Sequence, residues 1–181
     1  MPNNNCNLLT RENNMVSEKT APVAVIMGSD SDMKVMKSCI EQLGDFGIEP
    51  VVRVISAHRT PEIAAEFAQK AAENGIKVII AAAGMAAHLA GALAAKVTLP
   101  VIGVPLDSGG GLGGMDALLS TVQMPPGVPV ATMAIGKAGA KNAAIFAVQI
   151  LALADAGFSE KLADFKQDQK QKVIKKDAEL K

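Results

Sequence analysis

The 181-residue sequence has no tryptophan, no tyrosine and only five phenylalanines. Its eighteen basic residues are balanced by eighteen acidic ones, so its formal net charge is zero. Proteins that bind nucleic acid usually carry a basic surface and aromatic side chains on which bases stack. Because both features are missing, we expect the chain to bind neither nucleic acid nor an anionic membrane.

Cysteine is also scarce, since Cys6 and Cys39 form no CxxC motif and no extracellular disulfide pattern. We therefore expect two reduced thiols in a cytoplasmic protein. The length is sufficient to bury a core without disulfides or metal, and it predicts one domain over residues 22–181. Residues 1–21 are rich in asparagine and have no apolar core of the kind a secretion signal requires, so we expect a disordered leader.

One long segment, residues 78–95, lacks Lys, Arg, Asp and Glu, and it approaches the length of a membrane span. Half of its residues are alanine, and Gly84 and His88 interrupt it. Alanine contributes little transfer free energy, so a buried strand, a loop and a helix explain the segment better.

From Pro22 onward, apolar runs alternate with helical patterns, which predicts an α/β fold. The predicted strands are Val23–Met27, Val51–Ile55, Val78–Ala82, Val101–Val104 and Val130–Ala134. The predicted helices run from after Asp32 to about Phe46, from Pro61 to about Asn74, over His88–Ala95, Met115–Val122 and Gly139–Ala154, and over about 157–176. This alternation is typical of a three-layer, doubly wound parallel sheet of flavodoxin-like type with about five strands.

Local signals mark two of these helices. Thr60 is placed to cap the second helix, with Pro61 at its first position. Ile63, Phe67 and Ala71 are expected to form the inner stripe of that helix.

For the last helix, Ser159 is the expected cap. Its apolar stripe includes Leu162, Phe165, Val173 and Ile174. We find no obvious surface of its own domain for this stripe to cover, so we expect the helix to pack on a neighbouring subunit.

In sheets of this type the chemistry lies in the loops that leave the carboxyl ends of the strands. The first loop, Gly28–Asp32, offers backbone donors, small hydroxyls and a helix N-terminus, which suit a phosphate. Its carboxylates would suit ribose hydroxyls better. A tight turn with Ser31 as helix cap and Asp32 in the first turn explains this loop equally well.

The second loop, Ser56–Pro61, places one of only two histidines between a strand and a helix. Imidazole exchanges protons near neutral pH, and Arg59 supplies a fork-shaped cation able to hold a phosphate, while Ser56 adds a hydroxyl. This combination favours proton transfer by His58 on an anionic ligand. A structural histidine is the alternative, but packing alone does not account for one beside an arginine at such a position.

The third loop, Ala83–Leu89, has no polar side chain before His88. Its small residues let the backbone approach a flat ligand, and His88 either hydrogen-bonds that ligand or bonds locally at a helix start. The fourth loop contains GxGxxG at Gly109–Gly114, but it follows the fourth strand and is a weak dinucleotide signal. A mobile lid or a close backbone contact is the better interpretation.

Two other site types are disfavoured. Gly136-Lys137-Ala138 lacks the upstream glycine and the Ser/Thr of a P-loop. His58 and His88 have no partner at metal-ligand spacing, so we expect no metal.

Several motifs occur together and in order along the chain. They are Met27–Asp32, Ser56–Pro61, Ala83–Leu89, Val122–Pro125 and Ala134–Lys137. Together they resemble the catalytic subunit of phosphoribosylaminoimidazole carboxylase and, more narrowly, the bacterial 5-(carboxyamino)imidazole ribonucleotide mutases. The resemblance extends from about Val23 to the C-terminal helix at similar spacing.

The resemblance implies an isomerase of purine biosynthesis that moves a carboxylate from the exocyclic nitrogen of an aminoimidazole ribonucleotide to ring carbon 4, with no cofactor or metal. It also implies a homo-octamer in which the C-terminal helix reaches a neighbouring subunit. The residue roles it implies are phosphate binding by Ser29 and Arg59, ribose binding by Asp32, a pocket wall at Ser56, contacts with the base and its carboxylate by Gly84, His88 and Leu89, and general acid and base catalysis by His58.

The chain departs from the family pattern in three places. Met85 stands where glycine is usual, Ala90 where proline is common, and Gly109–Gly114 replaces a loop with fewer glycines. These departures bear on lid closure and substrate affinity. A related class carboxylates aminoimidazole ribonucleotide directly, carries lysine after the histidine and lacks the second histidine, so Arg59 and His88 favour the mutase.

A non-catalytic flavodoxin-like binding module is a third hypothesis. It would need the phosphate cradle but not His58. Its receiver-type version is disfavoured, because the third strand ends in Ala82-Ala83-Gly84 and not in a phosphoacceptor aspartate.

Overall fold

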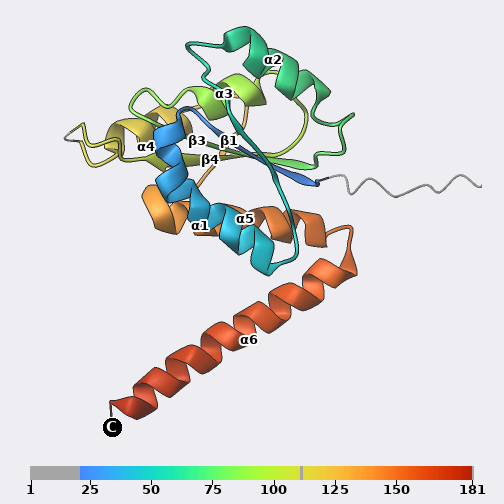
Figure 1. Ribbon diagram of the computed structural model, residues 1–181, viewed down its shortest axis with the longest axis vertical. Helices are drawn as coiled ribbons and strands as arrows, with labels where there is room; N and C mark the ends of the chain where they lie inside the picture. The colour runs from blue at the N-terminus through green and yellow to red at the C-terminus, as the bar shows by residue number, and fades with distance from the viewer. Residues whose placement is uncertain (1–20, 111, 181) are drawn as a thin grey trace, which may run out of the picture.

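The computed structural model describes residues 21–110 and 112–180, and a parallel β-sheet lies at its centre (Figure 1). The sheet has five strands in the order β2-β1-β3-β4-β5. They are β1 Val23–Met27, β2 Val51–Val54, β3 Val78–Gly84, β4 Val101–Leu106 and β5 Ala131–Thr132. The predicted α/β class and parallel sheet are confirmed, and the strand order is that of flavodoxin-like sheets. Apart from Ala21, the expected leader lies outside the described residues.

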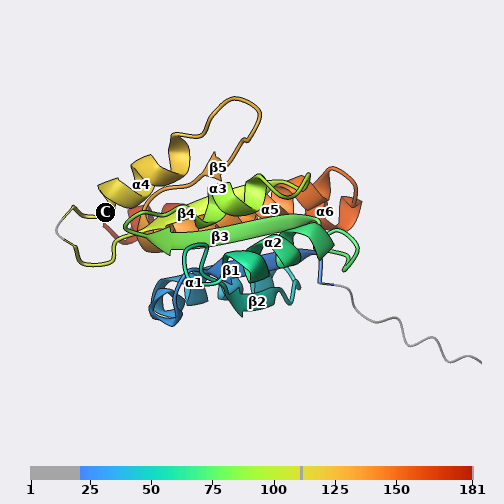
Figure 2. The ribbon, with the colours of Figure 1, turned by 90° about the horizontal axis from the view of Figure 1, so that it is seen from above.

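The helices cover both faces of this sheet (Figures 1 and 2). They are α1 Met33–Asp45, α2 Pro61–Lys70, α3 Leu89–Ala94, α4 Met115–Val122, α5 Gly136–Ala152 and α6 Ala156–Glu179, with a 3-10 turn, η1, at Asp30–Asp32. Helices α1 and α5 pack on one face, and α2 and α3 pack on the other. The result is the three-layer arrangement that the alternating pattern predicts.

The first strand shows why its sequence is apolar throughout. Side chains in a strand point alternately to opposite faces. Val23, Val25 and Met27 join the core with α1 and α5, whereas Ala24 and Ile26 join the core with α2 and α3. All of them are fully buried, because β1 lies between β2 and β3 and is covered on both faces.

The predictions for α2 are confirmed in part: Thr60 is at the cap position, Pro61 begins the helix, and Phe67 and Ala71 lie against the core. Two details differ. Thr60 does not cap the helix with its side chain; its Oγ1 donates to the Ser56 carbonyl and accepts from the Ser56 amide, both at 3.0 Å. Ile63 is 43% exposed, and the helix buries Ala64 and Ala68 instead. Alanines let α2 lie close to the sheet, which places the larger Ile63 outside the contact.

Helix α6 also begins differently from the prediction. Asp155 is its cap and accepts a hydrogen bond from the Gly157 amide at 2.9 Å. Ser159 lies inside the helix, where its hydroxyl donates to the Ala152 carbonyl at 3.2 Å. The helix therefore starts at Ala156, because a carboxylate near a helix N-terminus accepts its unpaired amides.

Part of the apolar stripe of α6 has a partner within the chain, contrary to expectation. Leu162 is buried in the core with α1 and α5, and the Phe165 ring packs on Phe46 at a centroid distance of 5.3 Å. Beyond these contacts α6 projects from the body (Figure 1), and Val173 and Ile174 are 68% and 50% exposed. Only the C-terminal half of the stripe therefore lacks a surface to cover.

The alanine-rich segment 78–95 folds as β3, a loop and α3, as expected. Within the described ranges, no helix combines the length and the apolar character needed to cross a membrane.

Two glycines provide a matched test of the packing. A Cβ at Gly139, in the first turn of α5, would collide with the Ala134 carbonyl, whereas a Cβ at Gly44 in α1 meets no atom within 4 Å. We expect Gly139→Ala to lower the free energy of unfolding by about 1–3 kcal/mol, because the start of α5 must move. Gly44→Ala should raise it by about 0.5–1 kcal/mol through better helix propensity. Urea unfolding measures both, and unchanged stability in Gly139→Ala would contradict the close approach.

Candidate active site

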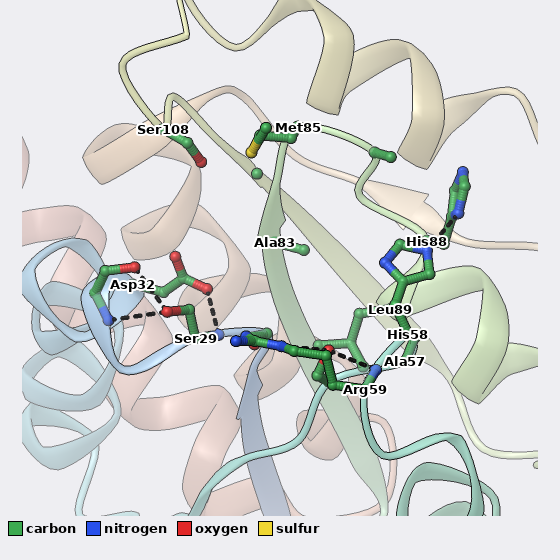
Figure 3. A pocket seen from close by; sticks show the side chains of 15 residues that line it. Ser29, Asp32, Ala57, His58, Arg59, Ala83, Met85, His88, Leu89 and Ser108 are labelled. Atoms are coloured by element: carbon green, nitrogen blue, oxygen red, sulfur yellow. Dashed lines mark hydrogen bonds between the residues drawn. The ribbon is translucent and has the colours of Figure 1, made fainter.

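One pocket, of about 500 Å³, lies at the carboxyl ends of β1, β2 and β3 (Figure 3). This is where the strand order places it, because the chain runs outward from β1 to β2 and then returns past β1 to β3, and this reversal leaves a crevice at the strand ends. Its walls contain every residue that the sequence suggested for the site: Ser29, Asp32, Ser56, His58, Arg59, Gly84, His88 and Leu89. The lining also includes Ala57, Ala83, Met85 and Ser108.

The loop after β1 is organised by Ser29, not by Ser31 as the tight-turn interpretation proposed. The Ser29 hydroxyl accepts from the Ser31 amide at 3.3 Å, and the Ser29 amide donates to Asp32 Oδ2 at 3.0 Å. These reciprocal bonds form a capping box at the start of η1. The hydroxyl and the carboxylate are therefore oriented before any ligand arrives.

Asp32 is only 8% exposed, which is unusual for a carboxylate. Burial raises its pKa, because removing water penalises the charged form. The hydrogen bond from the Ser29 amide opposes this rise in pKa, as do the nearby Gly28 amide and Ser31 hydroxyl, while the charge of Asp30 adds to it. Ligand hydroxyl donors would replace part of the lost hydration.

Arg59 is held across the first two loops. Its Nη2 donates to the Gly28 carbonyl at 3.1 Å, and its backbone N–H donates to the Ser56 hydroxyl at 3.2 Å. In Figure 3 its guanidinium extends towards Ser29. Neither of the two ion pairs in the described part of the chain involves Arg59, so its charge is available to an anion.

The two histidines meet directly, although they are thirty residues apart in the sequence. His58 Nε2 lies 2.9 Å from His88 Nδ1, and the rings are at 79° to each other. One nitrogen donates the shared proton and the other accepts it. Among the described residues, neither ring's second nitrogen has a hydrogen-bond partner, so both are available to a ligand.

The third loop forms the wall between the histidines and the β4 end. A Cβ at Gly84 would collide with the Ser108 hydroxyl and lie 3.1 Å from the Leu106 carbonyl oxygen, so a larger residue there would require the Ser108 side chain to move. Leu89 is buried beneath the pocket, and Met85 has a positive φ of 56°. For a side chain like methionine this conformation costs about 1–2 kcal/mol relative to the right-handed region.

Sequence reasoning did not single out Ser108 as a site residue. The signal was its position two residues after the end of β4, which pairs with β3 and therefore ends at the same edge of the sheet. From the glycine-rich tract 109–114, no described residue lines the pocket. Gly111 lies outside the described residues, and Gly109, Gly113 and Gly114 have positive φ values.

Other chemistry has little support in the described ranges. No group of three or more His, Cys, Asp or Glu there is placed to hold a metal ion. Cys39 is buried in α1, and burial raises the pKa of its thiol to about 12, so it stays protonated and unreactive. The other cysteine, Cys6, lies outside the described residues.

Comparison with known proteins agrees with this geometry. The family model described as AIR carboxylase matches residues 22–172. The N5-carboxyaminoimidazole ribonucleotide mutase of Bacillus subtilis is 52% identical over 158 residues, which cover 87% of this chain and 97% of the relative. That of Escherichia coli is 50% identical over 154 residues, covering 85% and 90%. The crystal structure of Treponema denticola PurE is similar, with a TM-score of 0.78 and 30% identity over 88% of this chain and 98% of that one. The chain therefore belongs to the AIR carboxylase family.

Proposed function

We propose that this chain is a mutase of purine biosynthesis that converts 5-(carboxyamino)imidazole ribonucleotide to 4-carboxy-5-aminoimidazole ribonucleotide. The observation that carries the proposal is the hydrogen-bonded His58–His88 pair in one pocket with Arg59 and Asp32. Relatives that are named as mutases and share about half of their residues with most of this chain support it.

The pocket offers a distinct group for each part of such a substrate. Arg59 and the Ser29 loop suit the phosphate, because a fork of N–H donors and a hydroxyl both bind phosphate oxygens. Asp32 accepts hydrogen bonds from the ribose hydroxyls. The flat base then lies against Gly84 and Leu89, with its carboxylate near the histidines.

His58 carries the proton transfers in this mechanism. When the bond between nitrogen and the carboxylate carbon breaks, its electron pair stays on the exocyclic nitrogen, which takes a proton from protonated His58. Ring carbon 4 then attacks the released carbon dioxide and forms a carbon–carbon bond. The proton on carbon 4 leaves to the neutral His58, which returns to its starting state. The balance needs no oxidant or reductant.

His88 supports His58 by direct hydrogen bonding. Its Nδ1 fixes the orientation of the His58 ring, and it shares the proton that His58 gains or gives. Because the outer nitrogens of both rings have no partner among the described residues, either ring can also contact the carboxylate of the substrate.

The proposal extends to assembly. The exposed C-terminal stripe of α6 contains Val173 and Ile174, and burying it against another copy would remove apolar area from water. We propose a cytoplasmic homo-octamer in which this stripe packs on a neighbouring subunit.

The first test compares two substrates with the native protein and with His58→Asn. Freshly generated 5-(carboxyamino)imidazole ribonucleotide should be converted rapidly by the native protein, and the variant should lose at least about 100-fold in kcat, since general acid–base catalysis contributes that much or more. Preference for aminoimidazole ribonucleotide plus bicarbonate would indicate a direct carboxylase. Inactivity of the native protein with both substrates would contradict the proposed function and favour a binding module. Full activity of His58→Asn would contradict the role of His58 as general acid and base.

Asp32→Asn separates binding from stability. The raised pKa means that Asp32 favours folding in its protonated form and that this contribution is lost as pH rises through the folded pKa. The variant should therefore gain thermal stability relative to the native protein at neutral pH and gain less at acid pH. Its KM should rise roughly tenfold, because a charged acceptor for ribose is lost. An unchanged KM would remove Asp32 from the ribose site.

The assembly is tested by sedimentation at micromolar concentration. Replacing Val173 and Ile174 by serine should shift the protein to smaller species, because the apolar contact is lost. Replacing Gln171 and Lys175 by serine is the matched control, because both are exposed on the other side of α6, and it should leave the assembly intact. A native protein that sediments as a monomer would contradict the proposed octamer.

A further inference from the structure

Met85 is the only residue other than glycine with a positive φ in the described part of the chain. Such outliers persist only where the surrounding structure enforces them, and they gather at functional sites. Here the Ala87 amide donates to the Met85 carbonyl at 2.9 Å, and the His88 amide donates to the Ala86 carbonyl at 2.8 Å. These tight turns hold Met85 in place on the same loop that carries His88.

The side chain of Met85 lies over the pocket and not in the core. It is 62% exposed, and it lines the pocket. In Figure 3 it lies across the pocket from Arg59, beside Ser108. The strained backbone therefore presents a large apolar group to the ligand space and to water, which is unfavourable without a ligand.

The rest of this wall cannot cover a ligand. Its other residues around Met85 are Ala83, Gly84 and Ala86, which have little or no side chain. Leu89, the other large aliphatic residue of the lining, is already buried. Met85 is thus the one flexible apolar side chain of the described lining that is free to move onto a bound base.

We infer that Met85 folds over the aminoimidazole and closes the space in which carbon dioxide is held between its release and its recapture. The inference rests on the proposed mutase activity. Carbon dioxide has no net charge, so confinement depends on shape and on the exclusion of water. A thioether suits this task, because it adapts to irregular surfaces and packs favourably on aromatic rings.

The chemistry predicts what is lost when this cover is removed. After the carbamate breaks, the nitrogen has taken its proton and the pocket holds aminoimidazole ribonucleotide with carbon dioxide. If carbon dioxide escapes, water hydrates it to bicarbonate and the ribonucleotide leaves without its carboxylate. Carbon dioxide formed from external bicarbonate can enter by the same route and appear in the product.

The test uses 5-(carboxyamino)imidazole ribonucleotide in isotopically labelled bicarbonate, with the enzyme-free decay subtracted. Met85→Ala removes the cover and keeps the strained backbone, and Met85→Gly removes the cover and the strain. Met85→Leu keeps an apolar cover. Met115→Ala removes an exposed thioether that lies outside the pocket and is the matched control.

In both the alanine and the glycine variant, we expect KM to rise roughly tenfold, as for the loss of a partly buried methionine side chain. The fraction of turnovers that release aminoimidazole ribonucleotide should rise several-fold, and so should label in the product. The leucine variant should still recapture most of the released carbon dioxide, and Met115→Ala should match the native protein. Met85→Gly should also melt a few degrees higher than Met85→Ala, because glycine adopts this φ without strain.

Several outcomes would overturn the inference while leaving the mutase proposal intact. In the first, the native protein converts the carbamate while the alanine and glycine variants leave three quantities unchanged: KM, the fraction of turnovers that release aminoimidazole ribonucleotide, and the label in the product. In that case Met85 is not the cover. A higher KM without release of carbon dioxide would limit Met85 to binding and overturn its role in confinement. By contrast, a native protein that does not convert the carbamate at all would contradict the proposed function itself.

Discussion

The site depends on one constraint, the parallel pairing of β1 with β2 on one side and with β3 on the other. Parallel strands end at the same edge, so the loops after these strands converge on one crevice. This pairing brings His88 to His58 and the Gly28 carbonyl to Arg59, although each pair is distant in sequence. The continuous burial of β1 on both faces fixes its register, because a shift of one residue would exchange its two sets of buried side chains.

Within that crevice the polar groups hold one another in place. Ser29 and Asp32 are joined by the capping box, Arg59 is tied to the Gly28 carbonyl, and the histidines share a hydrogen bond. Such contacts limit the reorganisation needed when a substrate binds. The crevice also contains two features that destabilise the folded state. Burial disfavours the charged form of Asp32 and raises its pKa, and Met85 has a left-handed backbone conformation.

The fold class and the meeting of the predicted site residues in one pocket could be predicted from sequence, because both follow from the alternation of apolar runs with loops of unusual content. Contacts set by tertiary packing could not be predicted. Ile63 has the spacing of a core residue, yet the neighbouring Ala64 and Ala68 fill that part of the core. Leu162 and Phe165 pack against their own chain, because the chain turns back at Asp155, where α6 begins. The His58–His88 bond needs two loops to meet, and neither loop shows this by itself.

The two halves of the pocket follow different physical rules. In the proposed binding mode, the phosphate and ribose meet a cation, a carboxylate and hydroxyls, whose interactions are directional and specific. Where we propose that the base lies, the lining changes to alanine and glycine. This suits a neutral intermediate, which offers little for charged groups to hold and is retained by shape. A wall of small residues lets one face of a flat base approach closely but leaves the opposite face of the base uncovered. Closing that side requires a large apolar group from the same loop, which the backbone conformation at Met85 supplies.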